Sequence, residues 1–302
     1  MYLVLLGTAA GGGFPQWNCY CPVCRVARAE PTRARPRTQS SAAVSADGQR
    51  WFLLNASPDV RDQLRLLPAP PAIGNRHHPV EGIVLSDPEL DHTLGLVLLR
   101  EGRQLAVYAT AATLQVLRED SRLLPVTEAF AAVAVTALDL DRPVPLRYRD
   151  GSASGLTVTA VAVAGDPPRF ARHDQPGHTV GLLLADQHTG GTAGFFPGCG
   201  ALDPALRERL AALDLLLLDG TFWTDDEMIR QGLSDHTARE MAHLPVSGPE
   251  GSLATLRSLP VRRKVYTHIN NSNPILLEDS AERREVEAAG VAIGADGMRF
   301  TV

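Results

Sequence analysis

The sequence predicts an α/β protein in which two sheets are covered by helices on both outer faces. Three observations lead to this fold class. The 302 residues are enough for a layered core. Segments typical of strands alternate with segments typical of helices, and several strand segments are short apolar runs of the kind buried on both faces. No linker or change of composition divides the chain. We therefore expect one domain over residues 1–302.

Short apolar or alternating runs indicate the strands of the first half of the chain. They are expected at Tyr2–Gly7, 41–46, 51–55, 82–85 and 105–108. An Asp-Gly pair between the second and third of these strands is a strong hairpin signal. Pro58 and Asp59 open an amphipathic helix, and further helices follow the strand at 82–85 and begin near Thr110. The stretch Glu30–Arg37, rich in Arg and Pro, is expected to be exposed coil.

The second half continues the same alternation. Strands are expected at 133–137, 144–149, 156–163, 180–185, 193–196, 215–218 and 265–267. Helices are expected at 203–211, near 235–243, near 249–257 and at 278–289. The turn residues Asp296 and Gly297 predict a final hairpin.

Charge and hydrophobicity exclude several classes of protein. The formal net charge of −5 gives no electrostatic footprint for nucleic acid. The apolar run Met1–Leu6 is only about as long as a strand and has no basic region before it, so it is not a signal peptide. No apolar run approaches the ~20 residues that a membrane-spanning helix needs. We expect a soluble, cytoplasmic protein without membrane insertion.

Three of the four cysteines, Cys19, Cys21 and Cys24, fall on one short loop in the order Cys-x-Cys-x2-Cys. A disulfide framework would spread its cysteines along the chain. Three neighbouring thiolates instead suit a tetrahedral zinc ion, which needs one further ligand from elsewhere. We therefore expect a structural zinc site in the loop 19–24. The isolated Cys199 is most simply a small turn or core residue.

The stretch VEGIVLSDPELDHTLGL at 80–96 places polar side chains directly after a buried strand. Its adjacent Asp91 and His92 offer a hard oxygen and a borderline nitrogen to a divalent metal. The carboxyl end of a buried strand is also where α/β proteins carry their chemistry. The alternative is a helix N-terminus that is capped by an Asp and carries a solvated His. This stretch alone leaves both interpretations open.

Two other buried strands end in the same way. Asp219 follows a run of four leucines, and His268 follows the strand at 265–267. Three coincidences at the same end of different strands favour a common site. Asp91, His92, Asp219 and His268 would form a centre of two histidines and two carboxylates, suited to iron, manganese or zinc.

The order of these residues resembles the metallo-β-lactamase superfamily, whose hallmark loop is Thr-His-x-His-x-Asp-His. Here that loop reads Ser-Asp-Pro-Glu-Leu-Asp-His at 86–92, with Asp87 and Glu89 where the upstream histidines belong. Longer segments are similar to the pyrroloquinoline quinone (PQQ) biosynthesis protein B family. They are GTAAGGGFPQWNCYCPVC, RTQSSAAVS, LLNASPDVRDQL, LDHTLGLVLLREG, LLLLDGTFWTDDEMIRQG, LPVSGPEGSL and RKVYTHINNSNPIL.

The resemblance implies an αββα enzyme of PQQ biosynthesis. That family is described as an iron-dependent oxygenase that hydroxylates the tyrosine ring of a crosslinked Glu-Tyr intermediate. Loss of two histidines leaves one complete metal site, similar to the mixed His and carboxylate sites of non-haem Fe(II) oxygenases. Asp87 and Glu89 are themselves hard oxygen donors, so a second Mn²⁺ or Mg²⁺ stays open. The implied ligands of Fe(II) are Asp91, His92, Asp219 and His268.

Further roles are expected for four residues. The resemblance assigns acid/base chemistry to His243; the alternative is a capping or helix-surface histidine. Arg37, Arg61 and Asn270 are expected to contact the substrate, the two arginines because a precursor with several carboxylates needs cations. Similar proteins complete the zinc loop with a His at the position of Asn271. Either His268 turns toward the thiolates, or another residue or water supplies the fourth ligand.

Two other functions compete with the oxygenase. One is a metal-dependent hydrolase of the superfamily, and the other is a carrier that takes part in transport of PQQ to the periplasm. The expected partners are a small-molecule PQQ precursor, O₂ and other proteins of the pathway, with a homodimer as one assembly to test. Nucleic acid is not expected.

Overall fold

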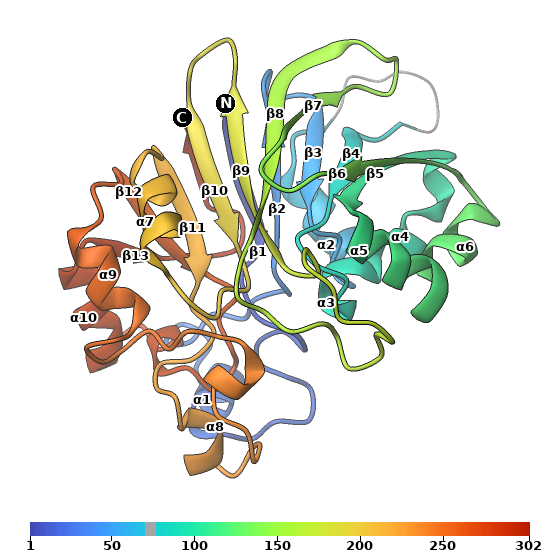
Figure 1. Ribbon diagram of the computed structural model, residues 1–302. Coiled ribbons are helices and arrows are strands. Elements are labelled where there is room, and N and C mark those ends of the chain that lie inside the picture. Colours follow the sequence, from blue (N-terminus) through green and yellow to red (C-terminus); the bar gives the residue numbers. More distant parts are fainter. Residues whose placement is uncertain (70–76) are drawn as a thin grey trace.

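The computed structural model describes residues 1–69 and 77–302. Two seven-stranded sheets face each other, and helices cover their outer faces (Figure 1). This arrangement confirms the expected α/β class with αββα layering. Both sheets are mixed, because each combines antiparallel and parallel neighbours.

The first sheet has the strand order β14-β1-β2-β3-β4-β5-β6. Its strands are β1 (Tyr2–Gly7), β2 (Ser41–Ser45), β3 (Trp51–Leu54), β4 (Val80–Val84), β5 (Gln104–Thr110), β6 (Ala132–Leu138) and β14 (Arg299–Thr301). The strands from β14 to β3 pair antiparallel, whereas β3 to β6 pair parallel. The expected hairpin of β2 and β3 is confirmed, and Gly48 in its loop has the positive φ of 75° that glycine tolerates best.

The second sheet has the strand order β13-β12-β11-β10-β9-β8-β7. Its strands are β7 (Pro143–Arg147), β8 (Ala153–Ala162), β9 (Val180–Asp186), β10 (Thr192–Phe196), β11 (Leu215–Asp219), β12 (Arg263–Thr267) and β13 (Val291–Ile293). The strands from β7 to β10 pair antiparallel, and those from β10 to β13 pair parallel. The parallel strands β11 and β12 end side by side, which brings the residues that follow them to one edge of the sheet.

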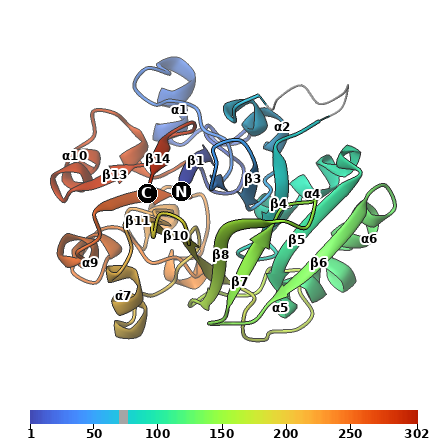
Figure 2. The same ribbon diagram turned by 90° about the horizontal axis from the view of Figure 1, so that it is seen from above.

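The helices are short. They are α1 (Pro22–Ala29), α2 (Val60–Gln63), α3 (Leu90–Thr93), α4 (Gly95–Leu98), α5 (Ala111–Gln115), α6 (Leu123–Glu128), α7 (Pro204–Ala211), α8 (Glu227–Arg230), α9 (Ser252–Ser258) and α10 (Ala281–Ala288). Single turns of other helix types complete them: η1 (Leu64–Leu66), η2 (Arg100–Gly102), η3 (Val116–Asp120), η4 (Arg239–Met241) and η5 (Pro274–Leu276). In Figure 2, α4, α5 and α6 lie outside the first sheet, whereas α7, α9 and α10 lie outside the second. Among the helices of the described residues, none combines the length and hydrophobicity needed to cross a membrane.

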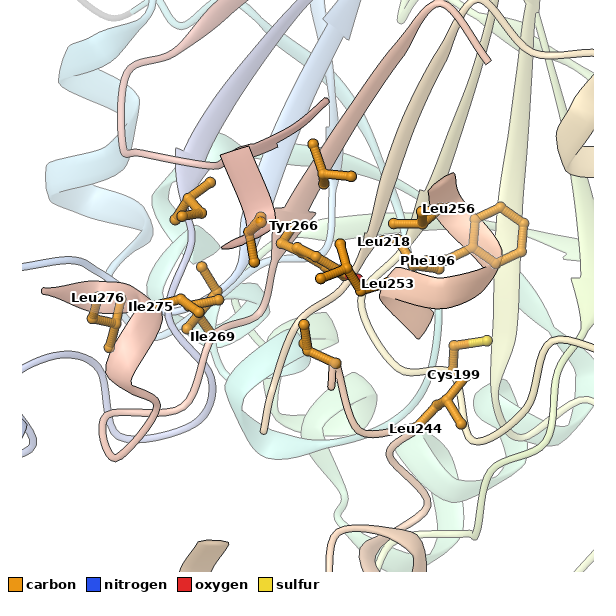
Figure 3. Packing of buried hydrophobic residues seen from close by; sticks show 14 of the residues in the cluster. Phe196, Cys199, Leu218, Leu244, Leu253, Leu256, Tyr266, Ile269, Ile275 and Leu276 are labelled. Atoms are coloured by element: carbon orange, nitrogen blue, oxygen red, sulfur yellow. The ribbon is translucent and has the colours of Figure 1, made fainter. Parts of the chain in front are cut away.

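Strand β11 shows why a continuous leucine run is buried. Leu215 and Leu217 belong to the core between the sheets, whereas Leu216 and Leu218 pack into the core under the outer helices. Figure 3 shows Leu218 close to Leu253 of α9. Both faces of the strand are therefore covered, and each fully buried leucine contributes about 2 kcal/mol of hydrophobic stabilisation.

The expected helix near 235–243 is wrong, because only the turn η4 forms there. Thr237 and Glu240 do make a capping box, in which each side chain accepts a hydrogen bond from the other's backbone N–H. The turn ends at Ala242, whose left-handed backbone (φ 58°) stops the helix. This early stop is what directs His243 toward Asp219.

The final hairpin around Asp296 and Gly297 is also wrong. β13 pairs with β12 in the second sheet, and β14 pairs with β1 in the first. The turn therefore crosses between the sheets. Asp296 holds it in place by accepting hydrogen bonds from the hydroxyl groups of Thr8 and Thr38 and from the Thr38 N–H.

Candidate metal centre

Five titratable side chains from both sheets meet at one edge of the molecule. They are Asp91, His92, Asp219, His243 and His268, which we call the candidate metal centre. Two groups have ligand atoms within 4.8 Å of one another: Asp91 with His92 and His268, and Asp219 with His243 and His268. All four expected iron ligands are therefore in this cluster, joined by His268, which both groups share.

The first group comes from α3 and from the residue after β12. Asp91 Oδ2 lies 3.4 Å from His268 Nε2 and 3.7 Å from His92 Nε2. Burial alone would raise the pKa of Asp91, but the facing His92 and His268 hold it below its usual value. This carboxyl group is therefore ionised at neutral pH and available to a cation.

His92 has the environment of a metal ligand. Its Nδ1 donates to Asp87, whose carboxylate oxygens both lie 2.7 Å away. Its Nε2 is buried and has no hydrogen-bond partner among the described residues. Burial alone would lower the pKa of His92, but the carboxylates of Asp87 and Asp91 raise it to about 9. An orphaned, buried nitrogen beside a carboxylate is what a bound cation would complete, so this side chain fits a metal.

Asp219, at the end of β11, accepts four hydrogen bonds. One oxygen accepts from the Thr221 N–H (2.9 Å) and hydroxyl (2.5 Å), and the other from the Cys199 N–H (3.0 Å) and His243 Nδ1 (2.6 Å). These donors and His243 lower the pKa of Asp219 despite complete burial. In turn, Asp219 raises the pKa of His243, which burial alone would lower.

The third imidazole, His268, is oriented in the same way. Its Nδ1 lies 2.8 Å from the Thr221 hydroxyl oxygen. Because that hydroxyl donates to Asp219, it accepts from His268 Nδ1–H. His268 also has a left-handed backbone (φ 53°), which turns it out of the strand direction. All three histidines thus use Nδ1 to hold a neighbouring oxygen, which leaves Nε2 free of that bond.

Several functional neighbours were not predicted. Asp87 was expected only as a donor to a second metal, but its oxygens bind His92, the Ser86 hydroxyl and the Glu89 N–H. Neither Asp87 nor Glu89 joins a three-donor group within the part of the chain that the structure describes. Burial, together with Asp87 and Asp91, raises the pKa of Glu89 to about 7. Thr221 carried no sequence signal beyond following a strand end.

Gly11 lies directly against the centre. A Cβ atom built on this residue would come within 3.2 Å of Asp91 Oδ2. Gly11 belongs to the glycine loop that follows β1. Its missing side chain leaves room beside the Asp91 carboxylate.

The residues expected to contact the substrate lie in different surroundings. Arg37 is only 6 % exposed, and its guanidinium donates to the Gly294 carbonyl and the Thr8 hydroxyl. Arg37 therefore supports the crossing between the sheets, and its contact with substrate stays a prediction. Arg61 is exposed on α2 and makes no hydrogen bond or ion pair within the described residues. Asn270 alone adjoins the centre, because its N–H donates to the Thr221 carbonyl.

The loop 19–24 gathers its cysteines in a second buried group. Cys19, Cys21 and Cys24 have sulfur atoms within 4.8 Å of one another and form no disulfide. The Cys21 thiol lowers the pKa of Cys24, which favours a thiolate at neutral pH. The Asn271 side-chain nitrogen lies 3.1 Å from Cys19 Sγ and 3.3 Å from Cys24 Sγ. We call Cys19, Cys21 and Cys24 the cysteine cluster. It is separate from the metal centre, since His268 faces Asp91 and does not turn toward the thiolates.

Comparison with known proteins places this arrangement in a family. The model of the beta-lactamase superfamily domain matches residues 50–269. Coenzyme PQQ synthesis protein B of Gluconacetobacter diazotrophicus is 44% identical, with 99% of each chain covered. The same protein of Methylococcus capsulatus is 43% identical, with 100% of each chain covered.

Solved structures agree with this result. Zn²⁺-bound PqqB from Methylobacterium extorquens is 40% identical, covers 100% of both chains and superposes with a TM-score of 0.91. A diphosphatase of the PhnP family reaches a TM-score of 0.70 at 20% identity, covering 100% of this chain and 97% of the other, which concerns the fold alone. The fold and the centre at the strand ends define a protein of the metallo-β-lactamase superfamily. Within it, the chain belongs to the coenzyme PQQ synthesis protein B family.

Proposed function

We propose that this protein is an iron-dependent oxygenase that hydroxylates the tyrosine ring of a crosslinked Glu-Tyr precursor of PQQ. Membership of the PQQ synthesis protein B family supports the pathway. The donor set supports the reaction class: Asp91, His92 and His268 offer two imidazoles and one carboxylate, the combination typical of non-haem Fe(II) oxygenases. This triad is the observation that carries the proposal.

The burial and charge of these side chains fit a metal ion. His92 Nε2 is buried and finds no partner in the described part of the chain, and the pKa of Asp91 is lowered, so both side chains are suited to a cation. We propose that Asp91, His92 and His268 hold the ion and that Asp219 serves as a further ligand on the side of His243. Bound Fe(II) would supply the activation of O₂. The Methylobacterium extorquens relative is Zn²⁺-bound, and zinc accepts imidazole and carboxylate ligands.

His243 is the proposed acid/base residue. Its Nδ1 donates to the buried carboxylate of Asp219, while the side chain is 19% exposed and so reachable from the solvent side of the centre. The ring is stacked on His268 at a centroid distance of 5.4 Å. His243 is thus held where it could take a proton from the substrate phenol and return it, with Asp219 stabilising the charged imidazole.

Other features support the remaining parts of the proposal. Asn270 is the proposed substrate contact at the centre; its side-chain amide is bound to Ser272, and Ser272 is bound to the buried Glu227. The three free cysteines support a zinc site and a reducing, cytoplasmic location. Donors from both sheets support a single domain over residues 1–302, because neither sheet alone would complete the centre.

A single-turnover experiment tests the activity. The protein is loaded with Fe(II) without oxygen, supplied with the crosslinked precursor and then exposed to O₂. Hydroxylated product in the wild type, together with loss of both iron and product in His92→Ala, supports the oxygenase. Undiminished turnover in His92→Ala, with the metal content measured, refutes the assignment.

The same experiment separates the competing functions. The hydrogen-bonded pair of His243 and Asp219 would also suit a hydrolase, which would cleave an ester or phosphodiester whether or not O₂ is present. A carrier would bind the finished quinone tightly and turn over nothing. Either result would replace the oxygenase proposal.

A further inference from the structure

We propose that Asn271 is a positioning residue that links the cysteine cluster to His268, so that the state of the cluster sets how tightly the candidate metal centre holds its ion. This inference rests on the proposed function, because it requires the centre to bind a metal. It concerns a connection between two groups that are separate in space but only three residues apart along the segment 268–271.

One end of this segment has a backbone that needs support. His268 follows β12 directly and has a φ of 53°, a region that residues other than glycine rarely occupy. Such a conformation persists only where its surroundings hold it. The direction of the imidazole at the centre therefore depends on how firmly the following residues are fixed.

The middle of the segment is tied to the N-terminal loop. The Ile269 N–H donates to the Thr8 carbonyl at 2.9 Å, and the Ile269 carbonyl accepts from the Ala10 N–H at 3.0 Å. Gly11, the next residue of that loop, packs against Asp91. The loop that leads to the cysteines is thus bonded to the residue beside His268 and touches a second member of the centre.

The other end of the segment lies inside the cysteine cluster. Asn271 is 4% exposed, and its side-chain nitrogen lies 3.1 Å, 3.9 Å and 3.3 Å from the sulfur atoms of Cys19, Cys21 and Cys24. Its backbone carbonyl lies 3.6 Å from Cys21 Sγ and 3.7 Å from Cys24 Sγ. The side chain of Asn271 therefore contacts every thiol of the cluster, and its main chain contacts two of them.

The cluster itself is anchored to the fold. Arg28 of α1 donates to the Cys19 and Cys24 carbonyls, and Cys24 N–H donates to Cys21 Sγ at 3.4 Å. A cation bound to the thiolates would order them and so fix Asn271. Because Asn271 is only three residues along the chain from His268, it would fix His268 as well. Loss of that order releases the segment at the end opposite the centre.

Cobalt(II) titration of the full-length protein, without oxygen, tests the link because it reports on each site separately. Co²⁺ bound to thiolates gives an intense sulfur-to-metal charge-transfer band in the near ultraviolet, whereas Co²⁺ bound to histidines and carboxylates gives weak visible bands. The test variant is Asn271→Asp, which keeps the shape of the side chain but replaces its donor with a negative acceptor facing the sulfurs. The matched control is Asn18→Asp, an exposed asparagine of the same loop.

We expect Asn271→Asp to weaken the binding that produces the visible bands about tenfold or more, as loss of a supporting contact does at other metal sites. Asn18→Asp should match the wild type. Equal midpoints of the visible bands in Asn271→Asp and the wild type would overturn the link, even if the charge-transfer band is lost.

A second measurement needs no variant. Loading the wild type with one equivalent of the thiophilic ion Cd²⁺ should fill the cysteine cluster and order Asn271. Co²⁺ binding at the centre should then tighten by roughly 5-fold or more, as is usual for coupled sites. Unchanged Co²⁺ affinity would contradict the inference. Absence of visible bands in the wild type at any Co²⁺ concentration would instead reject the metal centre of the proposed function, and the inference with it.

Discussion

The His92 imidazole and the Asp87 carboxylate form a buried pair in which Nδ1 lies 2.7 Å from both carboxylate oxygens. The side chains are 3% and 5% exposed. Asp87 occupies a position where the superfamily's hallmark loop carries a metal-binding histidine. In this chain Asp87 hydrogen-bonds the proposed ligand His92, so the loop holds this imidazole in place without the upstream histidine.

Replacing Asp87 tests this role. In Asp87→Asn the His92 ring loses its charged partner, so we expect the affinity of the centre for Fe(II) or Co²⁺ to fall about 10- to 100-fold. Competition with a chelator of known affinity measures it. Asp62→Asn, which alters an exposed carboxylate on α2, is the control and should retain wild-type affinity. Wild-type affinity in Asp87→Asn would show that Asp87 does not support the ligand.

The raised pKa of His92 predicts how the metal-free protein responds to pH. Its folded pKa of about 9 lies above the usual histidine pKa of 6.5, so the folded state binds the proton more tightly. The resulting stabilisation, on the order of 3 kcal/mol, is complete below pH ~6.5 and is lost as the pH rises to about 9. Urea unfolding of the metal-free protein at pH 6.5 and pH 9 measures this loss.

The same proton competes with the metal. Between pH 6.5 and 9 we expect metal affinity to rise by up to about tenfold per pH unit, because His92 must release its proton to bind. Asp87→Asn should flatten both pH dependences. A free energy of unfolding that stays constant across this range would contradict the assignment of a charged His92.

Thr221 joins two members of the centre through one hydroxyl group. Thr221→Val removes the donor to Asp219 and the acceptor for His268 while it preserves the shape of the side chain. We expect a loss of about 1–3 kcal/mol of stability, because both partners are buried, and weaker metal binding as well. Thr221→Ser retains the hydroxyl and should restore metal binding. Chemical denaturation and metal titration of both variants provide the comparison.

Gly11→Ala tests the space beside Asp91. The added methyl group would lie 3.2 Å from Asp91 Oδ2, so the carboxylate must shift. We expect weaker metal binding with little change in the free energy of unfolding, since Gly11 is exposed and its backbone needs no positive φ. Equal metal affinity in Gly11→Ala and the wild type would show that the carboxylate has room to move.

Sequence patterns predicted the elements that depend only on burial and strand direction. The four leucines of β11 are apolar on both faces because both faces are covered. Asp219 and His268 meet because the parallel strands β11 and β12 end side by side, and Asp91 and His92 join them from the facing sheet. These patterns depend only on burial and strand direction.

Other features depend on contacts between distant parts of the chain. The segment 235–243 has a capping box, which favours a helix. The helix nevertheless stops after one turn, and His243 hydrogen-bonds Asp219. Asp296 and Gly297 look like a hairpin turn, although the strands on either side join different sheets. Arg37 lies in a segment that resembles the family, and its guanidinium is used in packing. Local sequence does not encode such partners.

The candidate metal centre draws Asp91 and His92 from the first sheet, and Asp219 and His268 from the second. An ion bound by these donors would hold the two sheets of the sandwich together. Substitutions in the apolar layer between the sheets, such as at Phe195 or Leu217, would then shift one sheet relative to the other. Such a shift would change the coordination of the ion although no ligand is replaced.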